Sequence, residues 1–161
     1  MSKTQIATGG IADDAVTAAK ATGFGKIGQV LSTTIGSEQS TTSGTYADVS
    51  GLSQAITPVA TSSKIFVQAS IAGDVRNGSG SSTVGSIKLL RGSTELETKA
   101  SFIQINIGNG NPDKLAANCY HSFLDSPSST SALTYKYQFI VDGGTFRIGT
   151  NSKITLIEVL A

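Results

Sequence analysis

Sulfur and imidazole chemistry is nearly absent from this sequence, which holds one cysteine and one histidine among its 161 residues. A single cysteine excludes a disulfide within the chain, and one histidine beside it cannot complete a cysteine-type zinc site. The two residues are close together, as Cys119 and His121. In a strand these two positions point to the same face. We interpret them as a packed cysteine beside a histidine rather than as a catalytic pair.

Charge is also scarce. Charged residues make up 14% of the chain, whereas about 25% is usual in globular domains. The formal net charge is +1, so the chain lacks the basic field that attracts nucleic acids and anionic membranes. No apolar run approaches the roughly 20 residues of a membrane-spanning helix. We therefore expect neither a nucleic-acid partner nor membrane insertion.

Enzyme signatures are missing as well. The glycine-rich run from Gly23 to Gly28 lacks the spacing of a phosphate-binding loop. No pair among the carboxylates has a spacing that requires a glycosidase dyad. The loop from Asn109 to Asp113 could ligate calcium through its oxygens, although runs of this composition are mostly turns. We predict no enzyme activity and no catalytic, metal-binding or cofactor-binding residue.

Strand-forming segments are abundant from residue 27 to residue 161. Hydrophobic residues make up 39% of the chain, and turn signals recur roughly every 8 to 15 residues. In the longest segment, Ile65, Val67, Ala69 and Ile71 share one face. No amphipathic helix interrupts the pattern, which predicts an all-β, antiparallel, jelly-roll-like sandwich or a barrel. The expected strands are 27–35, 45–49, 52–56, 63–72, 84–91, 94–96, 100–107, 117–124, 133–141, 145–148 and 153–160.

The outward positions of these segments are unusually poor in charge. Serine and threonine together account for 41 residues of the chain, and many of them alternate with the apolar positions. An isolated soluble domain usually carries more charge on its surface. Two situations fit: a domain whose outer faces pack against copies of itself, and a protein exposed on an extracellular or particle surface.

Residues 1–26 form a segment of different character, extended or helical. A short helix is expected after Asp13 or Asp14, with Lys20 near its end and Gly23 as a stop. About two helical turns are marginal alone in water. The apolar residues of this region need another surface, which could be the main domain, sibling chains or a different protein. We predict that they anchor the chain: Ile6, Ile11, Val16, Phe24 and Ile27.

Several stretches together resemble the appendage proteins of bacteriophage virions. The segment 8–20, TGGIADDAVTAAK, resembles a short element of tail-fibre proteins. The remaining stretches are similar to the fibre-head β domains of such proteins: Tyr46–Leu52, Ile56–Pro58, Ser62–Ile65, Tyr120–Tyr135, Gly143–Gly144 and Lys153–Glu158. The resemblance covers most of the chain, and it carries no catalytic or ligand-binding residue onto this sequence.

The resemblance implies a jelly-roll-like domain that trimerises and an N-terminal segment that attaches it to the virion. Because the chain is much shorter than a typical tail fibre, a small capsid decoration or head-fibre knob fits better. The expected partners are two further copies of the chain and the major capsid protein or a tail component, after assembly in the host cytoplasm. The trimer would bury residues such as Ile154, Leu156 and Leu160, or their neighbours.

A second function stays open, that of a tail-fibre-type adhesin that binds a receptor or a host-surface glycan. Loops on a rigid scaffold commonly carry binding, and the loops 74–83 and 108–115 are rich in small polar residues. The other interpretation of these loops is that they are solvated connections. The candidate recognition residues are Asn77, Ser79, Asn109, Asn111 and Asp113.

Overall fold

The described part of this chain is built from β-strands. A computed structural model describes residues 26–76, 82–105 and 114–160, and the predicted antiparallel all-β class is confirmed. These residues contain no helix long and apolar enough to cross a membrane. The strands are β1 (Lys26–Thr34), β2 (Gln39–Thr41), β3 (Ala47–Ile56), β4 (Lys64–Arg76), β5 (Thr83–Arg91), β6 (Thr94–Ile105), β7 (Lys114–Asp125), β8 (Leu133–Asp142), β9 (Thr145–Ile148) and β10 (Lys153–Leu160).

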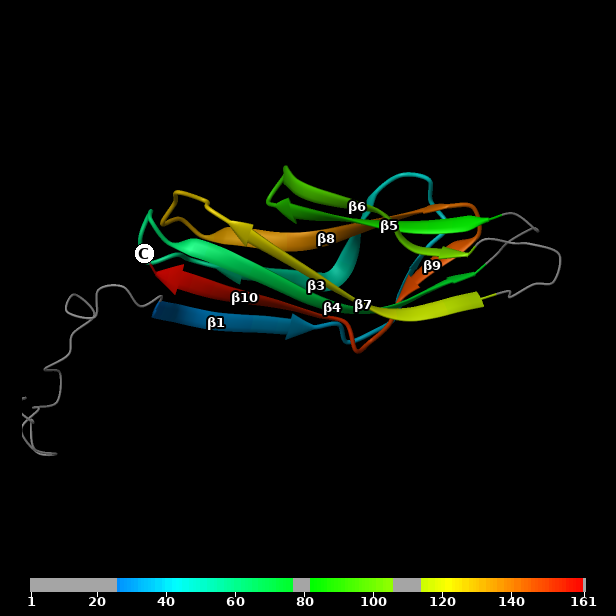
Figure 1. The fold of residues 1–161 in the computed structure, drawn as a ribbon, viewed down its shortest axis with the longest axis horizontal. Helices are drawn as coiled ribbons and strands as arrows, with labels where there is room; N and C mark the ends of the chain where they lie inside the picture. Colours follow the sequence, from blue (N-terminus) through cyan, green and yellow to red (C-terminus); the bar gives the residue numbers. More distant parts are fainter. Residues whose placement is uncertain (1–25, 77–81, 106–113, 161) are drawn as a thin grey trace, which may run out of the picture.

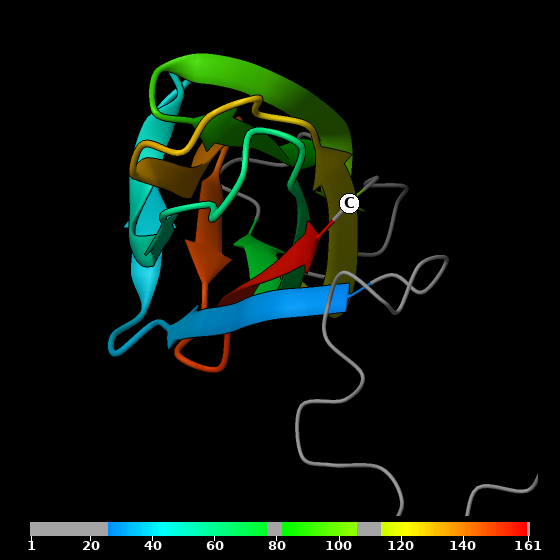
Figure 2. The same cartoon turned by 90° about the vertical axis from the view of Figure 1, so that its left-hand side faces the viewer.

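The strands form two sheets that pack face to face (Figure 1). In sheet A, β4 pairs with β7 along one edge and with β10 and then β9 along the other; β1 flanks β10, and β2 flanks β9. Sheet B has the order β3-β8-β5-β6. Figure 2 shows both sheets end-on, enclosing one interior. The orders β1-β10-β4-β7 and β3-β8-β5-β6 give the eight-stranded double sheet of a jelly roll.

Side chains that point between the sheets build a single core. Ile65, Val67 and Ile71 of β4 are fully inaccessible, and Ala69 is 4% exposed, so the predicted shared face is the inner one. Burying an aliphatic side chain of this kind stabilises the fold by about 1.5–3 kcal/mol. The largest fully buried side chains are Tyr135, Tyr137 and Phe146.

Two glycines make room for the ring of Phe146 in this core. A Cβ atom placed on Gly85 of β5 would lie 2.9 Å from the Phe146 ring and 2.9 Å from a methyl group of Val75. A Cβ on Gly73 of β4 would meet Ile103 at 2.9 Å. Such distances are shorter than real Cβ contacts. The Phe146 ring therefore fits only because Gly73 and Gly85 have no side chain.

Two strands are longer than the sequence predicted because bulges join segments that looked separate. The expected strands 45–49 and 52–56 are both part of β3, whose register with β8 shifts between Asp48 and Ser53. Gly51 has a positive φ of 82° in that interval, a conformation that glycine adopts without strain. The segments 94–96 and 100–107 overlap β6 in the same way, around Ser101 at φ 53°. The three-residue strand β2 was not predicted at all.

Substituting Gly85 with alanine should destabilise the fold by about 1–3 kcal/mol, because the added methyl group overpacks the core against Phe146. Urea denaturation of both proteins would measure this loss. Gly36→Ala is the matched control, since a Cβ there has no neighbour within 4 Å. The double variant Gly85→Ala with Phe146→Leu should recover part of the loss. Equal stability of the two single variants would contradict this packing.

Candidate interaction surface

Exposed apolar side chains concentrate on the two lateral strands of sheet A. Within the described residues, five of the six exposed large apolar side chains belong to β1 or β7, and the sixth, Val59, lies between β3 and β4. Monomeric proteins rarely expose contiguous apolar patches, and larger ones mark interaction sites. The five residues are Ile27 (65% exposed), Val30 (55%), Leu115 (41%), Tyr120 (81%) and Leu124 (52%).

The strand register joins some of these side chains into a row across the outer face of sheet A. Val30 on β1 lies opposite Ile157 on β10. Ile157 in turn lies opposite Phe66 on β4, and Phe66 lies opposite Leu124 on β7. Facing side chains on neighbouring strands are about 5 Å apart, so these four residues, here called the apolar row, span the width of the sheet.

A second row on the same face is polar but uncharged. It lies two residues further along each strand, because every second residue of a strand returns to the same face. Neither this row nor the apolar row contains a charged residue. The paired members of this second row are Ser32, Thr155, Gln68 and Ser122.

The outer face of sheet B carries charged pairs. Lys88 forms an ion pair with Glu95 at 2.8 Å and lies over the ring of Tyr46, 4.2 Å from its centroid. Lys136 forms an ion pair with Asp48, also at 2.8 Å. Charged pairs of this kind are typical of a solvated surface. Sheet A carries such pairs as well, toward the far end of β4, where Asp74 pairs with Arg76 at 2.9 Å and with Lys114 at 3.5 Å. The two uncharged rows therefore cover only part of its outer face.

Two buried polar bridges hold β7 against sheet B. The Asp125 carboxylate accepts hydrogen bonds from Arg91 and from the Tyr135 hydroxyl, both at 2.6 Å. Burial, and then the Asp125 carboxylate, raises the pKa of Tyr135, so the hydroxyl stays protonated and donates. A carboxylate that accepts from a guanidinium makes a strong, charge-assisted bond. This bridge fixes the end of β7 beside Leu124.

The second bridge is centred on His121, which is 6% exposed. Its Nε2 lies 2.7 Å from the Glu97 carboxylate, and its Nδ1 lies 2.6 Å from the Tyr137 hydroxyl. A hydrogen bond from Lys99 holds the pKa of Glu97 below its usual value, so Glu97 is ionised and accepts from Nε2–H. Burial, and then Glu97, raises the pKa of Tyr137. The Tyr137 hydroxyl therefore stays protonated and is hydrogen-bonded to Nδ1 of the ring.

A buried carboxylate secures the other lateral strand. Glu158 of β10 is fully inaccessible and accepts a hydrogen bond from Gln29 of β1 at 2.7 Å. Its second oxygen accepts from the main-chain N–H of Val59, also at 2.7 Å. Thr33 of β1 donates to Gln54 of β3 at 2.6 Å, across to sheet B. Both lateral strands of the exposed face are thus fixed by buried hydrogen bonds.

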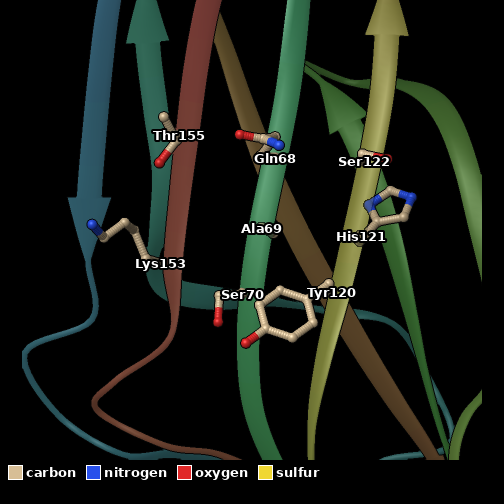
Figure 3. Close-up of a pocket in the computed structure, with 8 residues that line it drawn as sticks. All are labelled: Gln68, Ala69, Ser70, Tyr120, His121, Ser122, Lys153 and Thr155. Carbon is tan, nitrogen blue, oxygen red and sulfur yellow. The ribbon is translucent and has the colours of Figure 1, made fainter.

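A shallow hollow lies further along the same face (Figure 3). Its polar side chains come from β4, β7 and β10, and the ring of Tyr120 extends from β7 toward β4, beside Ser70. Ala69 and His121 line it from inward-facing positions, so they contribute its floor. The lining residues are Gln68, Ala69, Ser70, Tyr120, His121, Ser122, Lys153 and Thr155.

Most of the site residues predicted from the sequence lie outside the described residues. These are the anchoring residues Ile6, Ile11, Val16 and Phe24, the expected short helix, and the loop residues Asn77, Ser79, Asn109, Asn111 and Asp113. Ile27 is described, and it belongs to the exposed face of sheet A, where it pairs with Val159.

Cys119 and His121 point to the same inward face of β7, as predicted. Burial raises the pKa of the Cys119 thiol, and its Sγ lies 3.8 Å from the main-chain oxygen of Phe102. Thiols become reactive when their pKa is lowered, not raised. In the described ranges, no group of three or more His, Cys, Asp or Glu side chains is placed to hold a metal ion.

Two of the residues named for the subunit interface are in the core instead. Ile154 and Leu156 are fully inaccessible because they point between the sheets. Their neighbours Ile157 and Val159 occupy the outward positions of the same strand. Val30, Phe66 and Leu124 were not singled out from the sequence. Phe66 and Leu124 were a usable signal, because each is an apolar residue at a position of its strand that alternation assigns to the outer face.

Comparison with known proteins gave no matching family model and no matching curated protein. Among solved structures, the chain is similar to the VP2 subviral particle of infectious bursal disease virus, with 13% identity, a TM-score of 0.39, and coverage of 80% of this chain and 32% of that chain. The T13 particle of the same virus gives 14% identity, a TM-score of 0.37, and coverage of 81% and 35%. This chain therefore spans about a third of the length of those chains.

Replacing Tyr137 with phenylalanine should lower the free energy of unfolding by about 1–3 kcal/mol, because it leaves a buried nitrogen of His121 without a partner. Tyr46→Phe is the control, since the Tyr46 hydroxyl has no hydrogen bond to any described residue. Urea titrations of the two variants would give the difference. If both variants lose the same stability, His121 does not act as a bridge between the sheets.

Proposed function

We propose that this chain is a non-enzymatic structural protein of a phage virion, a short β knob that decorates the capsid or forms a head fibre. In this role the apolar row on the outer face of sheet A packs against sibling subunits in a homotrimer. The apolar row across that face is the observation that carries the proposal. The jelly roll itself is compatible with the role, since viral capsid domains and lectins both use it, but a fold alone does not define a function.

The apolar row favours association for a simple energetic reason. Each methylene group removed from water contributes roughly 0.8 kcal/mol, and Val30, Ile157, Phe66 and Leu124 present their side chains side by side. A ring of three subunits joins one surface to a different surface of the next copy.

The buried titratable groups support a structural role rather than a catalytic one. His121, Glu97 and Tyr137 bond to one another, and Asp125 bonds to Arg91 and Tyr135. Each of these groups connects strands of the two sheets. A catalytic group must come within hydrogen-bonding distance of a substrate. These groups form their hydrogen bonds with other side chains of the fold instead.

The N-terminal segment 1–26 is proposed to attach the knob to the particle, through the major capsid protein or a tail component. Its apolar residues recur at intervals without enough neighbours for a core of their own. The chain enters β1 at Lys26, and the next residue, Ile27, already lies on the exposed face of sheet A. A segment that leads directly into this face is well placed to connect the subunits with their mount.

Leu124→Glu should convert the trimer to monomers at micromolar concentration, because a carboxylate would have to be buried in an apolar contact. The expected loss of association is more than about 100-fold. Native mass spectrometry would measure it, with Val30→Glu as a second variant. Thr98→Glu, on sheet B, is the control and should remain trimeric. A monomeric wild type, or a trimeric Leu124→Glu, would refute the proposed interface.

Removing residues 1–25 should abolish incorporation into particles while leaving a soluble, folded β domain. The fold should persist because strand pairing begins at Lys26 and the first buried core residue is Ile35. Particles assembled with the truncated chain would be purified and their content measured by quantitative mass spectrometry. Stoichiometric recovery of the truncated chain with virions would contradict the anchoring role.

A further inference from the structure

The hollow around Tyr120 combines an exposed aromatic ring with neutral polar side chains. Tyr120 is 81% exposed, more than any other large apolar side chain of the described residues. Figure 3 shows its ring spread over the sheet surface toward β4, next to Ser70. Gln68, Ser122 and Thr155 lie on one side of the ring, and Lys153 extends from β10 toward β1.

The polar side chains of this hollow have no partner within the part of the chain that the structure describes. No hydrogen bond or ion pair joins Gln68, Ser70, Ser122, Thr155 or Lys153 to a described residue. Together they offer hydroxyl and amide groups that can donate and accept, and one ammonium group that donates. No carboxylate lines the hollow.

We infer that this hollow is a binding site for a neutral, hexose-based glycan. Sugars present a dense set of hydroxyl groups, which both donate and accept, and an apolar C–H face. The unpaired serine, threonine and glutamine groups match the hydroxyls. The exposed ring of Tyr120 offers an amphipathic surface, an apolar body with a polar tip, on which the C–H face can rest. A few placed polar groups beside an aromatic ring are typical of small-molecule sites.

An apolar protein surface fits this hollow less well than a sugar does. Covering five polar side chains without pairing them would cost the desolvation of each one, about 1–3 kcal/mol per group. The apolar row lacks these groups, and Leu124 is four residues, or about 13 Å, along β7 from Tyr120. The face of sheet A therefore has two chemically distinct regions, and the glycan site does not depend on the proposed subunit contact.

The test uses the full chain on an array of neutral oligosaccharides of glucose, galactose, mannose and N-acetylglucosamine, with sulfated and sialylated oligosaccharides as charged counterparts. The neutral oligosaccharide that binds best is then titrated by calorimetry. Tyr120→Ala should weaken binding at least tenfold, and Tyr120→Phe should stay within about threefold because it keeps the ring. Gln68→Ala should weaken binding about threefold to tenfold.

Tyr46→Ala is the matched control, because it removes a tyrosine that contacts Lys88 of the opposite sheet and should leave affinity unchanged. Circular dichroism would check that each variant is folded, and native mass spectrometry would report its oligomeric state. Three results would overturn the glycan site: no neutral oligosaccharide bound, binding confined to sulfated glycans, or full affinity in Tyr120→Ala. Dissociation of the oligomer in Tyr120→Ala would also overturn it, since Tyr120 would then be an interface residue.

Discussion

The pleat of a β-strand sends successive side chains to opposite faces, and the rest of this structure depends on that constraint. Two packed sheets can bury only their inner faces, so every outward residue must meet water or another molecule. The outer face of sheet B is solvated and carries ion pairs such as Lys88 with Glu95. Sheet A presents Val30, Ile157, Phe66 and Leu124 in one continuous row. The proposed assembly rests on this row, because contiguous exposed apolar side chains mark interaction sites.

The buried polar groups make that face rigid. Asp125 and His121 tie β7 to sheet B, while Glu158 ties β1 to β10 and to the β3–β4 connection. These hydrogen bonds lie on the inner side of the same strands that display the apolar row on the outer side. A rigid surface loses less conformational entropy when it binds. The buried hydrogen bonds thus hold in place the strands that carry the apolar row.

The two regions of the sheet A face would serve one particle in two ways. A trimer held by the apolar row would carry three hollows around Tyr120, and three weak glycan contacts on one knob give more avidity than a single one. Such a knob would combine a structural role with adsorption to a host surface. Placing recognition on a sheet rather than on long loops would also fix the polar groups before the ligand arrives.

The class of the fold could be predicted from the sequence, because period-two alternation and frequent turn signals leave few options other than an antiparallel β sandwich. The sequence also identified the inner face of β4 and the shared face of Cys119 and His121, since both depend only on local periodicity. It could not join 45–49 with 52–56 into one strand, because a bulge around Gly51 depends on the pairing with β8.

Which residues form the surface depends on how the strands pair and pack. The register between β1, β10, β4 and β7 aligns Val30 with Leu124, which are 94 positions apart in the chain. The packing of the sheets turned Ile154 and Leu156 inward and left Ile157 outside. Alternation along one strand shows that the strand has two different faces. Which face is buried depends on all the strands together, because the fold forms in the arrangement that removes the most apolar area from water.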